Sequence, residues 1–278
     1  MVSDETGQEP ASAGGRATVA RMYDYLLGGK HNFPADRAAA QALQRVVPES
    51  ADIALSNRQF LGRAVQVLAE RGIRQFIDLG SGIPTQGNVH HIVQRVDPTA
   101  RVLYVDIDPV AIVASNEILS GNPYCRAIEG DFTRPDLVLD ALAEGDLATL
   151  FDLDQPAALL YFAVLQQVSP SQVEAVVAPL RDRLVVGSAI AISHLSHVAV
   201  DTHGEDSVQV AKDVYRTQAR TEITLRSPEE ITPLFGDFSL LEPGLTRLSE
   251  WRPLGDGSDP YASAPERSPM VGGVGIRV

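Results

Sequence analysis

The sequence contains few of the residues that hold metals, disulfides or nucleic acids. It has one cysteine, Cys125, which excludes a disulfide framework and a multi-cysteine zinc or iron–sulfur site. Its six histidines are not placed with acids at a spacing typical of metal ligands, so we expect no metal. Basic residues are also scarce: 23 Lys and Arg stand against 36 Asp and Glu, for a net charge of −13. A chain this acidic is poorly suited to binding a phosphate backbone, and we expect no nucleic-acid partner.

Long apolar runs are absent as well. The longest, such as residues 157–165, fall far short of the ~20 residues that a membrane span needs. Residues 1–15 are polar and acidic, without the basic and apolar segments of a secretory signal, and they predict a disordered tail. The 278 residues suffice for one large domain, alone or with a helical appendage. The sequence therefore predicts a globular, cytoplasmic protein without a membrane partner.

Residues 16–72 have a helical pattern and no strand pattern. Apolar side chains recur with i, i+3, i+4 spacing over residues 17–27, and the glycine pair that begins at Gly28 ends that helix. Pro34 favours the first turn of a second helix to about residue 46, and a third helix is expected to end at residue 70. We interpret this part of the chain as an N-terminal helical cap.

After residue 72, short apolar segments alternate with helical ones. Five strands are expected at residues 74–79, 101–106, 124–129, 157–162 and 188–194. Because these segments are apolar on both faces and are separated by helices, they predict a parallel sheet covered by helices. Three further strands, with no full helix between the last two, are expected at residues 238–241, 247–251 and 272–278. This spacing favours an antiparallel hairpin at one edge of the sheet.

The most informative segment is FIDLGSGIP, residues 76–84, in which a strand runs into a glycine-rich turn that opens a helix. Gly80 and Gly82 allow a tight turn and the close approach of a ligand, and the helix N-terminus offers free N–H donors. The dinucleotide-binding pattern is met only in part, because Thr85 occupies the position of the third glycine. Asp78 adds a carboxylate at the strand end, which suits a cationic amine better than a pyrophosphate.

Acidic residues also follow the next two strands. Asp106 lies 24 residues after Gly82, where a carboxylate can accept hydrogen bonds from both hydroxyls of a ribose. Asp131 and Phe132 follow the third strand and offer the hydrogen-bond acceptor and the apolar wall that an adenine requires. The carboxyl ends of parallel strands share one edge of the sheet, where open α/β sheets bind ligands. We therefore expect a ligand that contains a nucleoside at this edge.

These motifs carry a resemblance to a known class of enzymes. D-x-G-x-G at residues 78–82, the strand end at Asp106 and the pair Gly130-Asp131 resemble motifs I, II and III of class I S-adenosylmethionine-dependent methyltransferases. The resemblance covers about residues 73–278. It implies an α/β fold with a doubly wound, Rossmann-like, mostly parallel seven-stranded sheet that ends in an antiparallel hairpin.

A narrower resemblance covers nearly the whole chain. The run RMYDYLLGGK at residues 21–30, the pair Asn57-Arg58 and SEWRP at residues 249–253 are similar to an actinobacterial S-adenosylmethionine-dependent methyltransferase family, formerly a domain of unknown function. This resemblance implies that S-adenosylmethionine binds between the sheet edge and the cap. The chain then divides into a tail over residues 1–15, a helical cap over residues 16–72 and a methyltransferase domain over residues 73–278.

The resemblance also implies roles for residues at the sheet edge. Asp78 is expected to face the amino group of the cofactor's methionine, and Asp106 to hold the ribose hydroxyls. The other cofactor contacts expected at this edge are Gly80 and Gly82, which give room at the main chain, and Ile107, Asp131 and Phe132, which hold the adenine.

The cap is expected to close the site. Arg21 or Lys30 is expected to pair with the carboxylate of the cofactor. Tyr23 is expected to wall the site, although packing against the core explains a tyrosine at this spacing equally well. Asn57 and Arg58 fit hydrogen bonding between helices as well as a role in the site.

The methyl donor brings its own electrophile, so the protein needs mainly alignment, an acceptor pocket and, for some acceptors, a base. His194 ends the fifth strand and is the candidate general base, because an unperturbed histidine titrates near neutral pH. A hydrogen-bonded structural histidine is the alternative.

The predicted function is methyl transfer from S-adenosylmethionine to a small-molecule acceptor. Two alternatives stay open. One is a protein that binds S-adenosylmethionine or a nucleoside without catalysis. The other is an NAD-dependent oxidoreductase, which would share the glycine-rich turn and Asp106 but leaves Asp78 and Asp131 unexplained.

Overall fold

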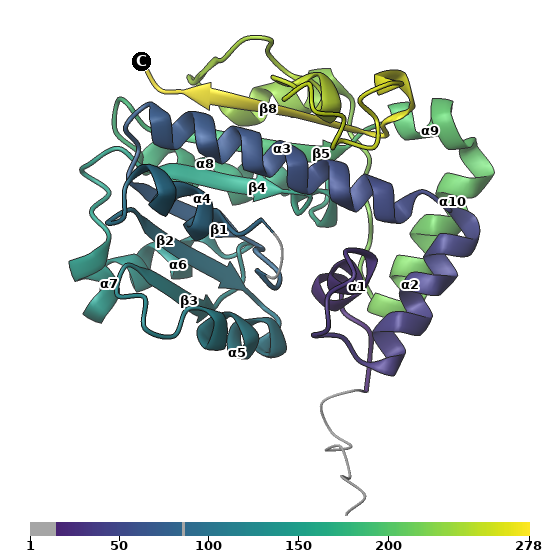
Figure 1. The fold of residues 1–278 in the computed structure, drawn as a ribbon, viewed down its shortest axis with the longest axis horizontal. Helices are drawn as coiled ribbons and strands as arrows, with labels where there is room; N and C mark the ends of the chain where they lie inside the picture. The colour runs from purple at the N-terminus through teal and green to yellow at the C-terminus, as the bar shows by residue number, and fades with distance from the viewer. Residues whose placement is uncertain (1–14, 85–86) are drawn as a thin grey trace, which may run out of the picture.

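The structure is a computed structural model that describes residues 15–84 and 87–278 (Figure 1). The tail predicted for residues 1–15 lies, except for Gly15, outside the described residues. The helices are α1 (Val19–Leu26), α2 (Pro34–Val46), α3 (Ser50–Glu70), α4 (Val89–Val96), α5 (Pro109–Ile118), α6 (Pro135–Leu142), α7 (Gly145–Leu150), α8 (Val173–Arg183), α9 (Val198–His203), α10 (Glu205–Val214) and α11 (Pro228–Ile231). The strands are β1 (Gln75–Leu79), β2 (Arg101–Asp106), β3 (Cys125–Glu129), β4 (Ala158–Phe162), β5 (Ala189–Leu195), β6 (Ser239–Leu240), β7 (Thr246–Arg247) and β8 (Met270–Ile276).

The strands form one sheet in the order β3-β2-β1-β4-β5-β8-β6, with β7 also paired to β8. The first five strands are parallel, and β8 runs antiparallel to β5. The chain fills one half of the sheet from β1 to β3 and then returns to β4 on the other side of β1, so the order reverses between β1 and β4. Open α/β sheets bind their ligands at such a reversal. The predicted doubly wound, mostly parallel sheet is confirmed.

The C-terminal edge differs from the predicted hairpin. The described part of the sheet has eight strands rather than seven, and β6 and β7 each pair with β8, not with one another. The strand expected at residues 247–251 breaks off at Arg247, where a 3₁₀ turn follows. The turn buries Leu248 and Trp251 in the core, and Arg63 of α3 donates hydrogen bonds to both of their carbonyl oxygens. Burial of these two side chains therefore takes the chain away from the sheet edge.

Helices cover both faces of the sheet. On one face α3 packs with α4, and Phe60 of α3 meets Phe162 and Trp251 with ring centroids 5.7 and 5.4 Å apart. On the other face α6 and α8 pack together over a second apolar cluster that includes Leu159 of β4 and Ile190 of β5. The helix α3, predicted as part of the cap, therefore also forms part of the core of the sheet.

The cap is a lobe that faces the carboxyl ends of the strands (Figure 1). Within it α2 packs against both α1 and α10, so a segment from after β5 completes what the N-terminal helices begin. Met22, Ala39 and Ala40 are buried at the centre of the lobe, with Tyr215 packed against them. The long helix α3 joins the two lobes because its C-terminal part lies on the sheet.

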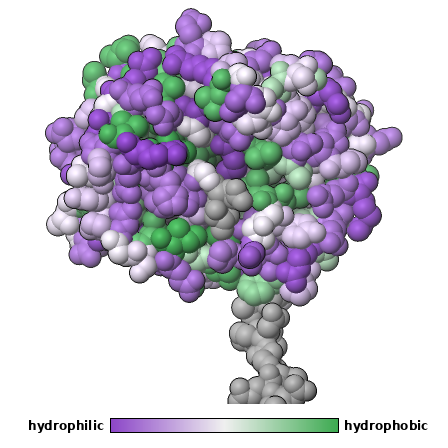
Figure 2. Space-filling view, viewed as in Figure 1, coloured by the Kyte–Doolittle hydropathy of each residue, from purple (hydrophilic) through white to green (hydrophobic). Residues whose placement is uncertain are grey.

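The surface of the molecule is polar on the face that is shown in Figure 2. The face shown in Figure 2 is mostly hydrophilic, with apolar residues exposed in separate patches. No helix within the described residues is long and apolar enough to cross a membrane.

Candidate active site

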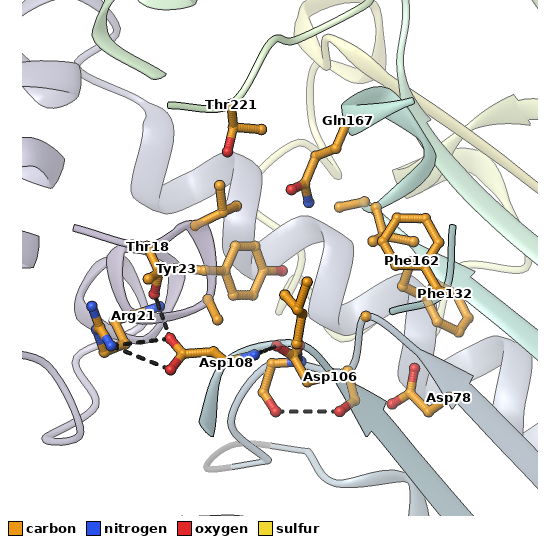
Figure 3. A pocket seen from close by; sticks show the side chains of 18 of the residues that line it. Thr18, Arg21, Tyr23, Asp78, Asp106, Asp108, Phe132, Phe162, Gln167 and Thr221 are labelled. Carbon is orange, nitrogen blue, oxygen red and sulfur yellow. Dashed lines mark hydrogen bonds and ion pairs between the residues drawn. The ribbon is translucent and has the colours of Figure 1, made fainter. Parts of the chain in front are cut away.

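A cavity of about 530 Å³ lies between the carboxyl ends of β1, β2 and β4 on one side and α1 and α3 on the other. Figure 3 shows Asp78 and Asp106 at the strand ends, with Tyr23 of α1 across the cavity from them. The predicted site residues that line it are Arg21, Tyr23, Asp78, Gly80, Gly82, Asp106, Ile107 and Phe132. Lys30, Asp131 and His194 are not among its lining residues.

Asp106 fixes the floor of the cavity. Its Oδ2 accepts a hydrogen bond of 2.7 Å from the main-chain N–H of Gly82, and its Oδ1 accepts one of 2.9 Å from the N–H of Asp108. The carboxylate thus ties the glycine-rich turn after β1 to the turn after β2. Burial raises the pKa of Asp106 above its usual range, although these hydrogen bonds act in the opposite direction. Each oxygen retains a lone pair for a ligand hydroxyl.

The glycine-rich turn needs glycine for two different reasons. Gly80 and Gly82 have φ of +65° and +61°, which only glycine adopts without strain. A Cβ on Gly80 would also lie 2.3 Å from Cγ2 of Val164, whereas a Cβ on Gly82 would have no neighbour nearer than 4.0 Å. The first glycine therefore allows β1 and the end of β4 to approach closely, and the second leaves open space inside the cavity.

Gly80→Ala is therefore expected to destabilise the protein more than Gly82→Ala. The left-handed backbone costs an alanine about 1–2 kcal/mol at either position. Overpacking against Val164 adds about 1–3 kcal/mol for Gly80→Ala alone. Urea unfolding of the two variants measures the difference, and equal losses of stability would show that Val164 moves aside.

Asp78 and Arg58 form the charged end of the cavity. Asp78 is buried at the end of β1, and burial raises its pKa to about 7, against the opposing effect of the Arg58 cation. The guanidinium of Arg58 lies 5.4 Å from the ring centroid of Tyr23. Its Nε is buried without a hydrogen-bond partner among the described residues. A buried donor without a partner costs stability, so this end of the cavity is suited to a zwitterion that satisfies both charges.

The opposite walls include residues that the sequence did not single out. Gln167 and Thr221 point into the cavity from the segments after β4 and after α10 (Figure 3). Ile107, predicted to contact a base, is 63% exposed and lines the cavity together with Phe132. Gln166 and Gln167 are consecutive in a short 3₁₀ helix, so their side chains point in different directions, and Gln167 is the one that lines this cavity.

The sequence profile of an S-adenosyl methyltransferase family matches residues 7–278. The chain belongs to this family. S-adenosylmethionine is therefore its cofactor, the protein is a methyltransferase, and the oxidoreductase alternative is wrong. Among curated proteins none matches this chain.

Solved structures agree with the family assignment. A protein from Thermobifida fusca YX, provisionally described as a methyltransferase, is 37% identical with a TM-score of 0.84, over 94% of this chain and 95% of that one. A DUF574 family protein from Streptomyces avermitilis MA-4680 is 33% identical with a TM-score of 0.86, over 95% of this chain and 99% of that one. The fold is shared with magnesium protoporphyrin IX methyltransferase from Synechocystis PCC 6803, solved with S-adenosylhomocysteine (13% identity, TM-score 0.52, 92% of this chain and 93% of that one).

Arg21 of the methyltransferase lines the cavity, but its guanidinium is bonded to other protein groups and not left free for the carboxylate of the cofactor. Its guanidinium is buried and forms ion pairs with Asp36 (3.0 Å) and Asp108 (3.2 Å), and it also donates to the carbonyl oxygen of Arg16. The side chain borders the cavity, but these bonds join the cap to the loop after β2. Of the two arginines, Arg58 has a buried donor, Nε, that lacks a hydrogen-bond partner among the described residues.

Lys30 and Asp131 also differ from their predicted places. Lys30, in the turn after α1, is exposed and does not line the cavity. Asp131 caps a turn instead: its Oδ1 accepts hydrogen bonds from the N–H and the hydroxyl of Thr133, at 2.9 and 2.6 Å. Of the pair predicted to hold the adenine, Phe132 alone lines the cavity.

His194 does not have the surroundings of a general base. It is fully buried; its Nδ1 donates to the carbonyl oxygen of Leu195 at 2.6 Å, and its Nε2 accepts from Arg226 at 2.7 Å. Burial, aided by the Arg226 cation, lowers its pKa to about 4. The side chain therefore stays neutral and has no lone pair for a substrate, which fits the structural alternative.

Proposed function

We propose that this methyltransferase acts on a small-molecule acceptor held between its two lobes. The observation that supports the proposal is the position of the cavity, which is walled by α1 and α3 of the cap as well as by the sheet edge. An acceptor must enter between these walls to reach a cofactor seated on the strand ends. The net charge of −13 also disfavours a nucleic-acid acceptor.

The residues present fit S-adenosylmethionine, which supplies an electrophilic methyl group when bound. Asp78 would hold the ammonium of its methionine and Arg58 the carboxylate, so that the buried carboxylate of Asp78 and the buried Nε of Arg58 both gain partners. Asp106 would accept the ribose hydroxyls while its own position is fixed by the two main-chain N–H groups. Ile107 and Phe132 would cover the faces of the adenine.

These residues act by positioning. Bound S-adenosylmethionine would supply the electrophilic methyl group and the sulfur leaving group, so the protein would have to direct a lone pair of the acceptor towards that group, while any proton on the acceptor atom passes to water. The fixed carboxylate of Asp106 and the charges of Asp78 and Arg58 would set the position of the cofactor for this transfer. No side chain of the site needs to form a covalent bond.

Cofactor affinity is expected to rise with pH up to about 7 and then to level off. The raised pKa of Asp78 means that its carboxyl binds a proton below about pH 7, and an ammonium favours the ionised form. Binding below pH 7 must therefore release that proton. Calorimetric titration with S-adenosylhomocysteine from pH 5.5 to 8.5 measures the profile, and Asp78→Asn is expected to flatten it as well as to weaken binding. A wild-type affinity that is constant across this range would contradict the role of Asp78.

Stability in the absence of ligand is expected to change with pH in the opposite sense. The folded pKa of Asp78 lies above its unfolded value of 3.8, so between about pH 4 and 7 the unfolded chain binds fewer protons at this residue. The contribution of Asp78 to stability is complete below pH 4 and is lost as the pH rises to 7. Urea unfolding of wild type and Asp78→Asn between pH 4 and 7 separates the contribution of Asp78 to the free energy of unfolding from the contributions of other titrating groups.

Transfer of labelled methyl groups tests the class of acceptor. An actinobacterial cell extract is incubated with the enzyme and methyl-tritiated S-adenosylmethionine and is then separated by ultrafiltration. Unreacted cofactor is itself a labelled small molecule, so the low-mass fraction is resolved further by chromatography. We expect a labelled low-mass product distinct from the cofactor, and no such product with Asp106→Ala as the control enzyme. Enzyme-dependent label in protein or nucleic acid would overturn the proposal.

We also propose that the enzyme works in the cytoplasm of an actinobacterium. Two relatives above 30% identity come from Thermobifida and Streptomyces, which supports the origin. The support for the compartment is the acidic composition of the chain, with its single cysteine.

A further inference from the structure

A second, smaller cavity of about 120 Å³ adjoins the cofactor cavity, between the cap and the ends of β4 and β5. It lies between α1, the junction of α2 and α3, α10 and the ends of β4 and β5. Three residues, Val19, Tyr23 and Ala163, line both cavities and so form the boundary between them. The rest of its lining is mainly aliphatic and includes Leu26, Leu43, Val47, Ile53, Ile223 and Leu225.

The boundary is held by a chain of buried hydrogen bonds. The hydroxyl of Tyr23 donates to the carbonyl oxygen of Ala54 (3.0 Å) and accepts from Nδ2 of Asn57 (2.9 Å). Oδ1 of Asn57 accepts from the hydroxyl of Ser193 (2.6 Å), which in turn accepts from the N–H of Ala163 (2.9 Å). One network therefore links α1, α3, β5 and the residue after β4 at the point where the cavities meet.

Ala163 has an unusual backbone at this point. Its φ is +53°, in the left-handed region that costs a residue with a Cβ about 1–2 kcal/mol. Residues held in such a conformation cluster at ligand sites and persist where the surrounding structure fixes them. Here the bonds from Ser193 fix it, and its side chain stands at the boundary of both cavities.

The polar residues in the described lining of the second cavity include Ser50, Gln166, His203 and Lys212. Nε2 of His203 lies 3.0 Å from Oε1 of Glu49, whereas the hydroxyl of Ser50 has neither a hydrogen bond nor an ion pair among the described residues. The hydroxyl of Ser50, at the start of α3, lines the cavity and is buried without a hydrogen bond among the described residues, and the residue is 4% exposed. A buried hydroxyl without a partner is rare, because it forfeits its hydrogen bonds to water. Its position suits a ligand that carries one polar substituent on an otherwise apolar body.

We propose that the second cavity binds the methyl acceptor, and that the acceptor is a monocyclic aromatic compound with a polar substituent. The inference rests on the proposed function, methylation of a small molecule. An aliphatic-lined cavity of roughly 150 Å³ holds one benzene ring in another protein, so the space here matches one six-membered ring. The ring lies among the aliphatic side chains, the substituent reaches Ser50, and the nucleophilic atom faces the boundary at Tyr23 and Ala163.

Fluorine NMR with 4-fluorophenol as the probe tests the site in the full-length enzyme saturated with S-adenosylhomocysteine. We expect 4-fluorophenol to bind and 5-fluorouracil, a polar ring of similar size, not to bind. Ala211→Phe places an aromatic ring into the cavity from α10 and should weaken binding of 4-fluorophenol at least about tenfold. Val210→Phe, on the exposed face of the same helix, is the matched control and should leave binding unchanged.

The outcomes separate this inference from the proposed function. Calorimetry with S-adenosylhomocysteine shows whether each variant is folded and binds cofactor. If S-adenosylhomocysteine binds but 4-fluorophenol does not bind wild type, or binds Ala211→Phe equally well, the second cavity is not an aromatic acceptor site while the cofactor site stands. If wild type does not bind S-adenosylhomocysteine, both proposals fail.

Discussion

Asp106→Ala is expected to weaken the binding of S-adenosylhomocysteine by about 10²–10⁴-fold. The carboxylate is placed to accept two ribose hydroxyls, and a hydrogen bond to a charged group contributes about 1.5–3 kcal/mol. Two such bonds amount to about 3–6 kcal/mol, which corresponds to that loss of affinity. The same carboxylate also binds the N–H groups of Gly82 and Asp108, so its removal loosens both turns at the cofactor. Isothermal titration calorimetry measures the change.

Asp106→Asn is expected to lose nearly as much affinity, although it is almost isosteric. Both carboxylate oxygens accept from main-chain N–H groups, and an amide NH₂ would direct a donor at one of these donors. Asp140→Asn, on the exposed side of α6, removes the same charge from the surface and should bind like wild type. An Asp106→Asn variant with unchanged affinity would show that the ribose is held elsewhere.

The part of the site on the sheet could be predicted because local pattern and topology are enough to place it. Each parallel strand ends in a recognisable turn, and parallel strands bring their carboxyl ends to one edge. Asp78, Gly80 and Asp106 therefore come together in any sheet with this order, whatever covers it. The family resemblance added the cofactor, which spacing alone leaves open between a nucleoside and a dinucleotide.

The part of the site on the cap could not be predicted in the same way. Arg21 and Arg58 lie on different helices, and only tertiary packing places Asp36 and Asp108 beside the first of them. His194 is similar, because its partner Arg226 follows it by 32 residues through a segment without a strand pattern. Whether an arginine or a histidine is already bonded to another side chain depends on tertiary contacts, and the sequence pattern does not show these contacts.

The second cavity shows the same limit. It forms because α10 packs against α2, a contact between segments separated by more than 150 residues. The sequence of α10 alone is polar and amphipathic, and it predicts a surface helix equally well. A cavity that is formed by such a contact between distant segments can be found only from the folded structure.

Replacing each of the two arginines of the cap by leucine is expected to affect a different property. Arg21→Leu should lower the stability of the fold, and Arg58→Leu should lower the affinity for the cofactor. Arg21→Leu leaves the carboxylates of Asp36 and Asp108 buried without their cation, and breaking a buried ion pair costs about 3–5 kcal/mol of stability. Arg58→Leu removes a guanidinium whose Nε has no hydrogen-bond partner in the described part of the chain, so a smaller loss of stability is expected, from its contact with Tyr23 and its attraction to Asp78. Its effect is on the ligand: the lost charged hydrogen bond lowers affinity for S-adenosylhomocysteine by about 10–100-fold.

Urea unfolding and calorimetric titration of both variants test this separation. Arg21→Lys keeps the positive charge and serves where Arg21→Leu does not fold, and Arg134→Ala, which breaks an exposed ion pair, should change stability by no more than about 1 kcal/mol. Arg58→Lys should recover part of the affinity, since an ammonium still attracts a carboxylate but lacks the planar fork of the guanidinium. Full affinity in Arg58→Leu, with the loss found instead in a stably folded Arg21 variant, would assign the cofactor carboxylate to Arg21. Stability and affinity are therefore expected to fall in different variants, because one arginine joins the lobes and the other faces the cavity between them.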